Sequence, residues 1–523
     1  MTYLSLADWA VIILYLLGII GLGVWFGKDQ RNTRDYFLGS KNIPWWGIGL
    51  SIVAAETSAL TIIGVPGMAY GGNLAFLQLI IGYVLARIIL AIVMVPHYLK
   101  GEIYSPYELF ANAFGASTRR TAGGFFLLSE TLAAGVRVYV VCIPIQLMLG
   151  IHVLPAIILF VGLSLFYTYV GGVKAVIWTD AAQFGLFLAG GIFTLYYIPH
   201  IYEGGLPAVY KAGYEAGKLH WLNVFPASAE PLTFFKLLKF LLEEPINLWM
   251  GIIGGTVMVM SSHGAEQLIV QRVLACKTVS EGRKALALSA VVIFPLFLIF
   301  LLIGAMLWVF YQKYPMPIAI PQPRAGIQKF DYIYPIFMLT GVPPVLKGFL
   351  IVAILSAAMS SVSSALTSLA SVSTMDFVKG LVSKNRSEEF FLRFSKASTV
   401  VWALVLIYVA YLSREVTFVL DAAFKLRGLT SGALLGGLLL AVFWKKGRGF
   451  PVITGMLCSL AVMIWISPMV QANLPAGWPR LSVKIAFPWY TLIGATIMLV
   501  VAWSVRFVTG GQVRALPVKE RRL

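Results

Sequence analysis

The feature that most limits how this chain can fold is the recurrence of long apolar runs. A transmembrane helix needs roughly 20 predominantly apolar residues to cross about 30 Å of hydrocarbon. We place thirteen such segments, at about 8–26, 45–70, 75–97, 121–148, 153–170, 176–198, 242–266, 285–311, 345–374, 396–413, 420–443, 450–467 and 487–508. The sequence is 59% hydrophobic and only 12% charged, with a mean hydropathy of +0.85. These features predict an all-α polytopic membrane protein.

The basic residues are unevenly distributed between alternate connections. One set of connections carries most of them, including Lys28, Arg31, Arg272, Lys277, Lys445 and Lys446. Basic residues favour the cytoplasmic side of a membrane. We therefore expect an integral protein of the plasma (inner) membrane whose N-terminus is outside and whose C-terminus is in the cytoplasm. The net charge of +18 follows from this topology and from contact with anionic lipid, so it does not indicate a nucleic-acid partner.

Two spans combine glycines with polar residues near their middle. In the second span, SIVAAETSALTIIGVPG, the polar residues are Glu56, Thr57, Ser58 and Thr61. In the seventh, MGIIGGTVMVMSSHGAEQ, the glycines are Gly254 and Gly255, and the polar residues are Ser261, Ser262 and His263. Interrupted helices are tolerated only where protein or a water-filled cavity surrounds them. Because the two spans are five apart, spans two to six and seven to eleven are predicted to be inverted repeats, with ligands bound where the interruptions meet.

This repeat hypothesis divides the chain into five parts. They are a first helix and loop at 1–44, a five-helix repeat at 45–198, an outer loop at 199–240, a second repeat at 241–444, and two accessory helices with a basic tail at 445–523.

The ninth span is unusually rich in hydroxyl groups. Helical periodicity places one small-residue face on it, made of Ala357, Ser360, Ser361, Ser364, Ser368 and Ser371. Such a face can serve close helix packing, with the hydroxyls bonded to their own backbone. It can equally form a sodium site, because a dehydrated cation needs several oxygen ligands. Asp180 in the sixth span lies at a matching depth; it is either half in water or part of the same site.

Together these motifs resemble the sodium:solute symporter family, which includes sodium–glucose, proline and sialic acid transporters with a LeuT-type fold. The resemblance covers nearly the whole chain. It rests on AAETSA, YTYVGGVKAVIWTDAAQ, EQLIVQRVLACKT and AAMSSVSSALTSLASVSTMDF. It implies a five-plus-five inverted-repeat core, sodium-coupled symport by alternating access, one or two sodium ions, and no organic cofactor.

The resemblance also implies ligands for each site. A first sodium falls on Ala54, Thr57, Ala357, Ser360 and Ser361. A second sodium, in members that bind one, falls on Asp180, Ser363 and Ser364. The solute falls on Glu56, Ser58, Thr61, Phe76, Gln78, Arg137, Ser262 and His263.

Arg137 matches the arginine that binds the substrate carboxylate in sialic acid transporters. The alternative is a structural ion pair, for which Glu56 is the expected partner. Glu56 stands where relatives carry a neutral residue, and Ser262 where sugar transporters carry a gating tyrosine. A sugar or sugar acid is the first expectation for the solute, and a monocarboxylate or an amino acid is the alternative. His263 is equally compatible with a packing role.

Lys425 and Arg427 lie near the outer end of the eleventh span. Asp421, four residues before Lys425, predicts an intrahelical ion pair. An outer-vestibule role in attracting solute is the alternative.

Three other classes of membrane protein fit the sequence less well. An intramembrane enzyme needs a nucleophile with its base or paired aspartates, and Asp180 has no such partner in the spans. A sensor needs a signalling domain, for which the short tail leaves no room. A channel needs an open pore, whereas interrupted helices with ion-ligand clusters favour occlusion. The expected partners are therefore a small-molecule solute, sodium and membrane lipid, with no obligate protein partner.

Overall fold

A computed structural model of the protein describes residues 4–26, 33–58, 60–101, 103–226, 231, 233–244, 246–320, 329–379, 386–415, 419–444, 447–475, 477–481 and 483–509. Within these ranges the regular structure is helical. Ten helical segments of the described residues are long and apolar enough to cross a membrane. They belong to α1 (Leu6–Phe26), α8 (Ala116–Leu149), α9 (Val153–Ile201), α15 (Val279–Lys313), α17 (Leu346–Val372), α19 (Glu388–Leu412), α20 (Val419–Phe443), α21 (Gly449–Ile466) and α23 (Trp489–Val508).

Helix α9 supplies two of these segments. Gly172 has φ 54° and ψ −167° inside it, a conformation that separates the predicted spans 153–170 and 176–198. Helix α5 (Leu77–Val93), at 17 residues, is shorter than the other spans but occupies the predicted third span. Two bent helix pairs can add two further spans. Each of the thirteen predicted segments is thus mainly helical in its described residues, with breaks inside the second and the seventh.

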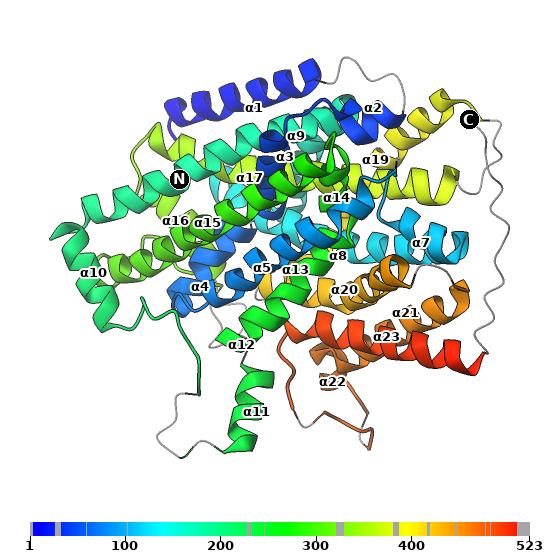
Figure 1. The fold of residues 1–523 in the computed structure, drawn as a ribbon. Coiled ribbons are helices and arrows are strands. Elements are labelled where there is room, and N and C mark those ends of the chain that lie inside the picture. Colours follow the sequence, from blue (N-terminus) through cyan, green and yellow to red (C-terminus); the bar gives the residue numbers. More distant parts are fainter. Residues whose placement is uncertain are drawn as a thin grey trace.

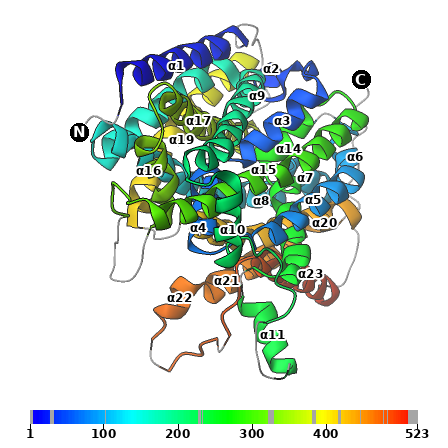
Figure 2. The same ribbon diagram turned by 90° about the vertical axis from the view of Figure 1, so that its left-hand side faces the viewer.

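The helices form one bundle around α17 (Figure 1). Helices α1 and α23 lie on opposite sides of this bundle in both views (Figure 1 and Figure 2). The apolar stretch of α17 is 89% buried, against 17% for α1. Its neighbours include α9, α8 and α3 (Trp45–Glu56). The hydroxyl-rich face of α17 therefore lies against protein and not against lipid.

The first broken helix turns directly after Glu56. Helix α3 ends there, and the chain continues as η2 (Leu60–Gly64) and α4 (Val65–Gly71) with a bend of 56°. The Thr57 N–H still donates to the Val53 carbonyl, but the Ser58 N–H donates to the Glu56 carbonyl at 3.0 Å. In a continuing helix the Ser58 N–H would bond the Ala54 carbonyl. The break thus removes the helical partner of that carbonyl.

The second interruption lies after Gly264 and not at the glycine pair Gly254–Gly255. Segments α12 (Leu248–Met250), η3 (Gly251–Gly255) and α13 (Thr256–Gly264) follow one another without a gap. Glu266 is extended, with φ −102° and ψ 133°, and α14 (Gln267–Leu274) follows it.

The glycines in η3 serve packing. A Cβ on Gly251 would stand 2.3 Å from the Gln78 carbonyl oxygen, so only glycine lets α5 approach this closely.

Three shorter helices lie in the connections between the predicted spans. Helices α10 (Gly205–Glu215) and α11 (Phe234–Glu243) lie in the predicted outer loop, and α11 extends away from the bundle (Figure 1). Helix α7 (Tyr107–Phe114) packs against α8 and α20 at the other end.

Candidate functional site

The predicted ligands of the first sodium lie on two elements that pack against each other, the end of α3 and the middle of α17. The Thr57 hydroxyl is buried and has no hydrogen-bond partner in the described part of the chain. A buried hydroxyl without a partner is costly, so this oxygen is available to a ligand. The Ser361 hydroxyl donates to the Ala357 carbonyl at 2.9 Å. The Ala54 carbonyl, which the break leaves without its helical partner, and these oxygens of α17 are neutral, buried oxygens of the kind a sodium ion requires.

Ser360 connects this set to the predicted second sodium site. Its hydroxyl donates to Asp180 Oδ1 at 2.6 Å. The hydroxyls of Ser363 and Ser364 donate instead to the Ser360 carbonyl, at 3.0 and 2.6 Å. The depth match predicted between Asp180 and the serine face is therefore confirmed for Ser360.

A guanidinium occupies the centre of the second set. Arg272 Nη2 lies 2.8 Å from Asp180 Oδ2 and also donates to the Ser364 hydroxyl. Its Nε donates to Ser51 Oγ at 2.8 Å, and that hydroxyl donates to Asp180 Oδ2 at 2.6 Å. Asp180 is fully buried and Arg272 is 2% exposed.

The sequence places Arg272 in the connection between the seventh and eighth spans, and the structure shows that this part of the connection is a buried helix. Arg272 lies on α14, the short helix that follows the second break. From sequence alone, a basic residue in a short helix that packs into the bundle cannot be distinguished from a basic residue in a loop.

A cavity of about 80 Å³ lies beside the break in α3. Six of the eight predicted solute ligands line it: Glu56, Ser58, Thr61, Arg137, Ser262 and His263. The other two lie outside its lining. Phe76 stacks on Phe297, which does line the cavity, with ring centroids 5.9 Å apart. Gln78 Nε2 donates to the Ala75 carbonyl, and its Oε1 accepts the Asn223 N–H at 2.8 Å.

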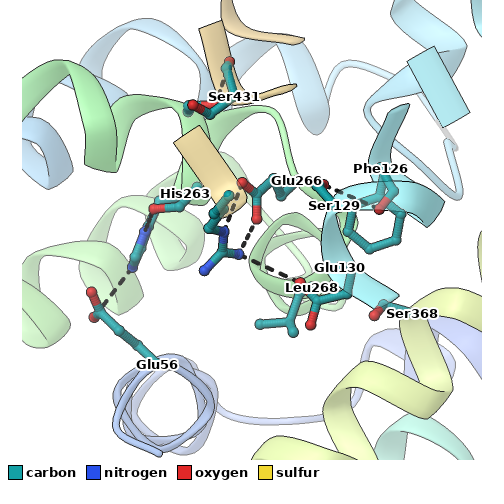
Figure 3. Close-up of polar contacts among 12 residues, drawn as sticks. Glu56, Phe126, Ser129, Glu130, His263, Glu266, Leu268, Ser368 and Ser431 are labelled. Carbon is teal, nitrogen blue, oxygen red and sulfur yellow. Dashed lines mark hydrogen bonds and ion pairs between the residues drawn. The ribbon is translucent and has the colours of Figure 1, made fainter. Parts of the chain in front are cut away.

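Glu56 is paired with an arginine that sequence analysis did not select. Arg87 on α5 is fully buried, and its Nη2 donates to Glu56 Oε2. Its Nη1 donates to the Tyr83 carbonyl at 2.9 Å. His263 Nε2 lies 3.4 Å from Glu56 Oε2 and 3.1 Å from Arg87 Nη2, and Figure 3 shows the imidazole pointing toward Glu56.

The expected Glu56–Arg137 pair is not formed. Arg137 Nη2 instead lies 3.0 Å from Glu130 Oε1. Arg427 on α20 binds both oxygens of Glu266, through Nε at 2.9 Å and through Nη2, and Nη2 is 3.7 Å from Glu130 Oε2. Figure 3 shows Glu266 and Glu130 joined to this one guanidinium.

Four charged residues thus line the cavity, Glu56, Arg137, Glu266 and Arg427, and their ion pairs add Arg87 and Glu130, so that three arginines and three glutamates form the charged shell of the site. Ionisable residues inside a membrane mark functional sites by default, and this rule applied to every span would have found Arg87 and Glu130.

The Asp421 side chain lies outside the part of the chain that the structure describes, so its pair with Lys425 stays a prediction. Arg427, in contrast, lines the cavity itself.

The fold and this paired-charge cavity beside a broken helix define a secondary transporter with a LeuT-type core. A model of the sodium:solute symporter family matches residues 36–458. The chain belongs to this family, and it is a sodium-coupled, multi-pass integral membrane transporter and not an enzyme.

Relatives span most of the chain. The sodium/sialic acid symporter SiaT of Proteus mirabilis is 29% identical over 466 residues, which cover 87% of this chain and 88% of SiaT. The sodium/glucose cotransporter of Vibrio parahaemolyticus is 26% identical over 482 residues, which cover 89% and 86% of the two chains. A solved structure of a Na⁺-coupled sialic acid symporter has the same fold, with a TM-score of 0.82 at 24% identity over 96% of this chain and 98% of that one. The nucleobase-cation-symport-1 transporter Mhp1 is more distant, with a TM-score of 0.54 at 13% identity over 91% and 94% of the two chains.

Proposed function

We propose that this protein carries a sugar or a sugar acid across the membrane together with one or two sodium ions, by alternating access. The observation that carries the proposal is the break after α3. At this break the Thr57 hydroxyl is buried and has no partner among the described residues, while its neighbours Glu56 and Ser58 line the cavity. Relatives named for sodium with sialic acid and with glucose support the solute class.

The proposed first sodium binds to Ala54, Thr57, Ala357, Ser360 and Ser361. Because the break in α3 then contributes to both sites, the ion and the solute stabilise the same arrangement of one element. Each ligand must therefore raise the affinity for the other, since coupling free energy is reciprocal. This shared break is the physical link between the two ligands.

The proposed second sodium binds at Asp180, Ser363 and Ser364. There it must compete with the Arg272 guanidinium, which lies 2.8 Å from Asp180 Oδ2. A cation that displaces Arg272 would break the bonds of this α14 side chain to Ser364 of α17 and to Ser51 of α3. A second ion would thus act on the helix behind the second break.

The energy available is sufficient for accumulation. One positive charge that moves through 100 mV releases about 2.3 kcal/mol. A tenfold sodium gradient adds about 1.4 kcal/mol. We place the protein in the plasma membrane with its N-terminus outside and its C-terminus in the cytoplasm. Sodium entry would then drive solute uptake.

A monocarboxylate or an amino acid is the second candidate. Its support is the side of the cavity lined by Arg137 and Arg427, which fits a carboxylate group. A bidentate guanidinium–carboxylate bond would serve a sugar acid and a simple carboxylic acid equally.

The proposal is tested by Ser361→Ala in purified protein reconstituted into liposomes. Uptake of labelled sugar or sugar acid should follow an inward sodium gradient in the wild type and lose its sodium dependence in the variant. Ser368→Ala is the matched control, because its hydroxyl on the same helix donates only to the Ala365 carbonyl, at 3.0 Å. Equal sodium dependence in wild type and Ser361→Ala would contradict the first site.

A further inference from the structure

The charges around the cavity cancel. Arg87 pairs with Glu56, Arg137 with Glu130, and Arg427 with Glu266, and the acidic members of the last two pairs are 1% exposed. An uncompensated charge is costly in a buried site. An anionic solute would add one negative charge to a balanced shell, whereas a solute of zero net charge would preserve the balance.

Four of these six charged groups line the cavity, namely Glu56, Arg137, Glu266 and Arg427, and Glu56 and Arg427 are the two most open of them. The Glu56 side chain is 15% exposed and the Arg427 side chain 24%, whereas Arg87 is 0% exposed. In the described part of the chain, the hydrogen bonds and ion pairs of Glu56 are made through Oε2, which leaves Oε1 for a donor from the solute. Those of Arg427 are made through Nε and Nη2, which leaves Nη1 for an acceptor.

The two open groups belong to different elements of one cavity. Glu56 ends α3 at the first break, and Arg427 lies on α20, paired with Glu266 at the second break. Figure 3 shows Glu56 apart from Glu266 and Glu130, which flank the bound guanidinium. A ligand between Glu56 and Arg427 contacts a negatively charged hydrogen-bond acceptor at one end and a positively charged hydrogen-bond donor at the other.

From this geometry we infer that the solute is dipolar: it carries an ammonium group that Glu56 binds and a carboxylate that Arg427 binds. The inference rests on the proposed function and narrows its solute to an amino-bearing sugar acid or an amino acid. Glu56 is then the residue that sets specificity, because it attracts the ammonium group and repels a simple anion. The hydroxyls of Ser58 and Thr61, which also line the cavity, would bind the polar body of the solute.

Two matched series of probes test the inference. The six-carbon series is D-glucose, D-gluconate, D-glucosamine and D-glucosaminate, and the three-carbon pair is lactate and alanine. Binding to the purified wild-type protein is measured by calorimetry in sodium chloride and in potassium chloride at equal ionic strength. In sodium, the zwitterion should bind about tenfold or more tightly than the anion of its series, because like charges placed together are strongly unfavourable.

Variants then assign the preference to Glu56. Glu56→Gln should abolish the advantage of the zwitterion over the anion. Because this change leaves Arg87 buried without its carboxylate, Glu56→Gln/Arg87→Gln removes one charge of each sign and keeps the shell neutral; it should abolish the same advantage. Glu389→Gln, in an exposed pair with Arg393, is the matched control and should keep the wild-type ranking.

The outcomes separate this inference from the proposed function. If probes bind in a sodium-dependent manner and gluconate or lactate binds most tightly, the inference fails and sodium coupling stands. An unchanged ranking in both Glu56 variants also overturns it. If no probe shows sodium-dependent binding, the proposed function and the inference fail together.

Discussion

Two of the arginine–acid clusters in the described part of the chain, at Asp180 and at the cavity, differ in what they leave free. At Asp180 both carboxylate oxygens are used: Oδ1 by Ser360, and Oδ2 by Ser51 and Arg272. At the cavity, Glu56 uses Oε2 and keeps Oε1 open. A saturated carboxylate can accept a new cation only by releasing an old one. If the proposed ligands bind, the first cluster must therefore exchange partners, whereas the second can add a ligand.

Removal of the exchangeable partner should have the largest effect. Arg272→Ala leaves the fully buried Asp180 carboxylate without its cation, a change that typically costs about 3–5 kcal/mol. If sodium binds at Asp180, it should restore part of this loss. We expect a lower melting temperature in potassium, with a larger gain on exchange to sodium than the wild type shows.

The control for this variant removes the acid as well. Asp180→Asn/Arg272→Gln keeps the site neutral, so it should melt closer to the wild type than Arg272→Ala does. It should also lower the steepness of the sodium dependence of uptake if two ions are coupled. Arg272→Ala with the same melting temperature in sodium and in potassium would show that no cation replaces the guanidinium.

The next effect concerns the hydroxyl that has no partner. Thr57→Val is close to isosteric and removes a buried group whose desolvation costs about 1–3 kcal/mol when it is unsatisfied. In potassium the variant should therefore be at least as stable as the wild type. In sodium it should lose the stabilisation that sodium gives the wild type, as a thermal unfolding series at increasing sodium concentration would show. A clear loss of stability in potassium would mean that Thr57 has a structural partner instead.

Sequence patterns identified the helices and the helices that pack against one another, because both can be read from the local pattern of apolar and small residues. The apolar runs gave the spans, and the hydroxyl face of α17 lies buried against α3 and α9 as the sodium hypothesis required. The partners of the charges were harder to identify. Arg272 is 92 residues from Asp180 and Arg427 is 161 residues from Glu266, so only the fold brings them together.

One ion pair could have been found from the sequence. Glu130 and Arg137 are seven residues apart on α8, two helical turns along one face, and both lie inside a predicted span. The resemblance directed attention to Glu56 instead. The interruption predicted in the seventh span lies after Gly264, next to His263, whereas the glycines of η3 permit close packing with α5.

The smallest effect should come from a residue that the resemblance assigned to the solute and the structure places elsewhere. Gln78 lies outside the cavity lining, and its Oε1 accepts the Asn223 N–H from the outer connection at 2.8 Å. Gln78→Ala should therefore cost about 1 kcal/mol of stability and leave the solute dissociation constant nearly unchanged. Ser58→Ala, inside the cavity, is the comparison and should weaken solute binding more. If Gln78→Ala weakens binding as much as Ser58→Ala does, Gln78 must turn from the outer connection into the cavity during the transport cycle, because its position here gives it no access to the solute.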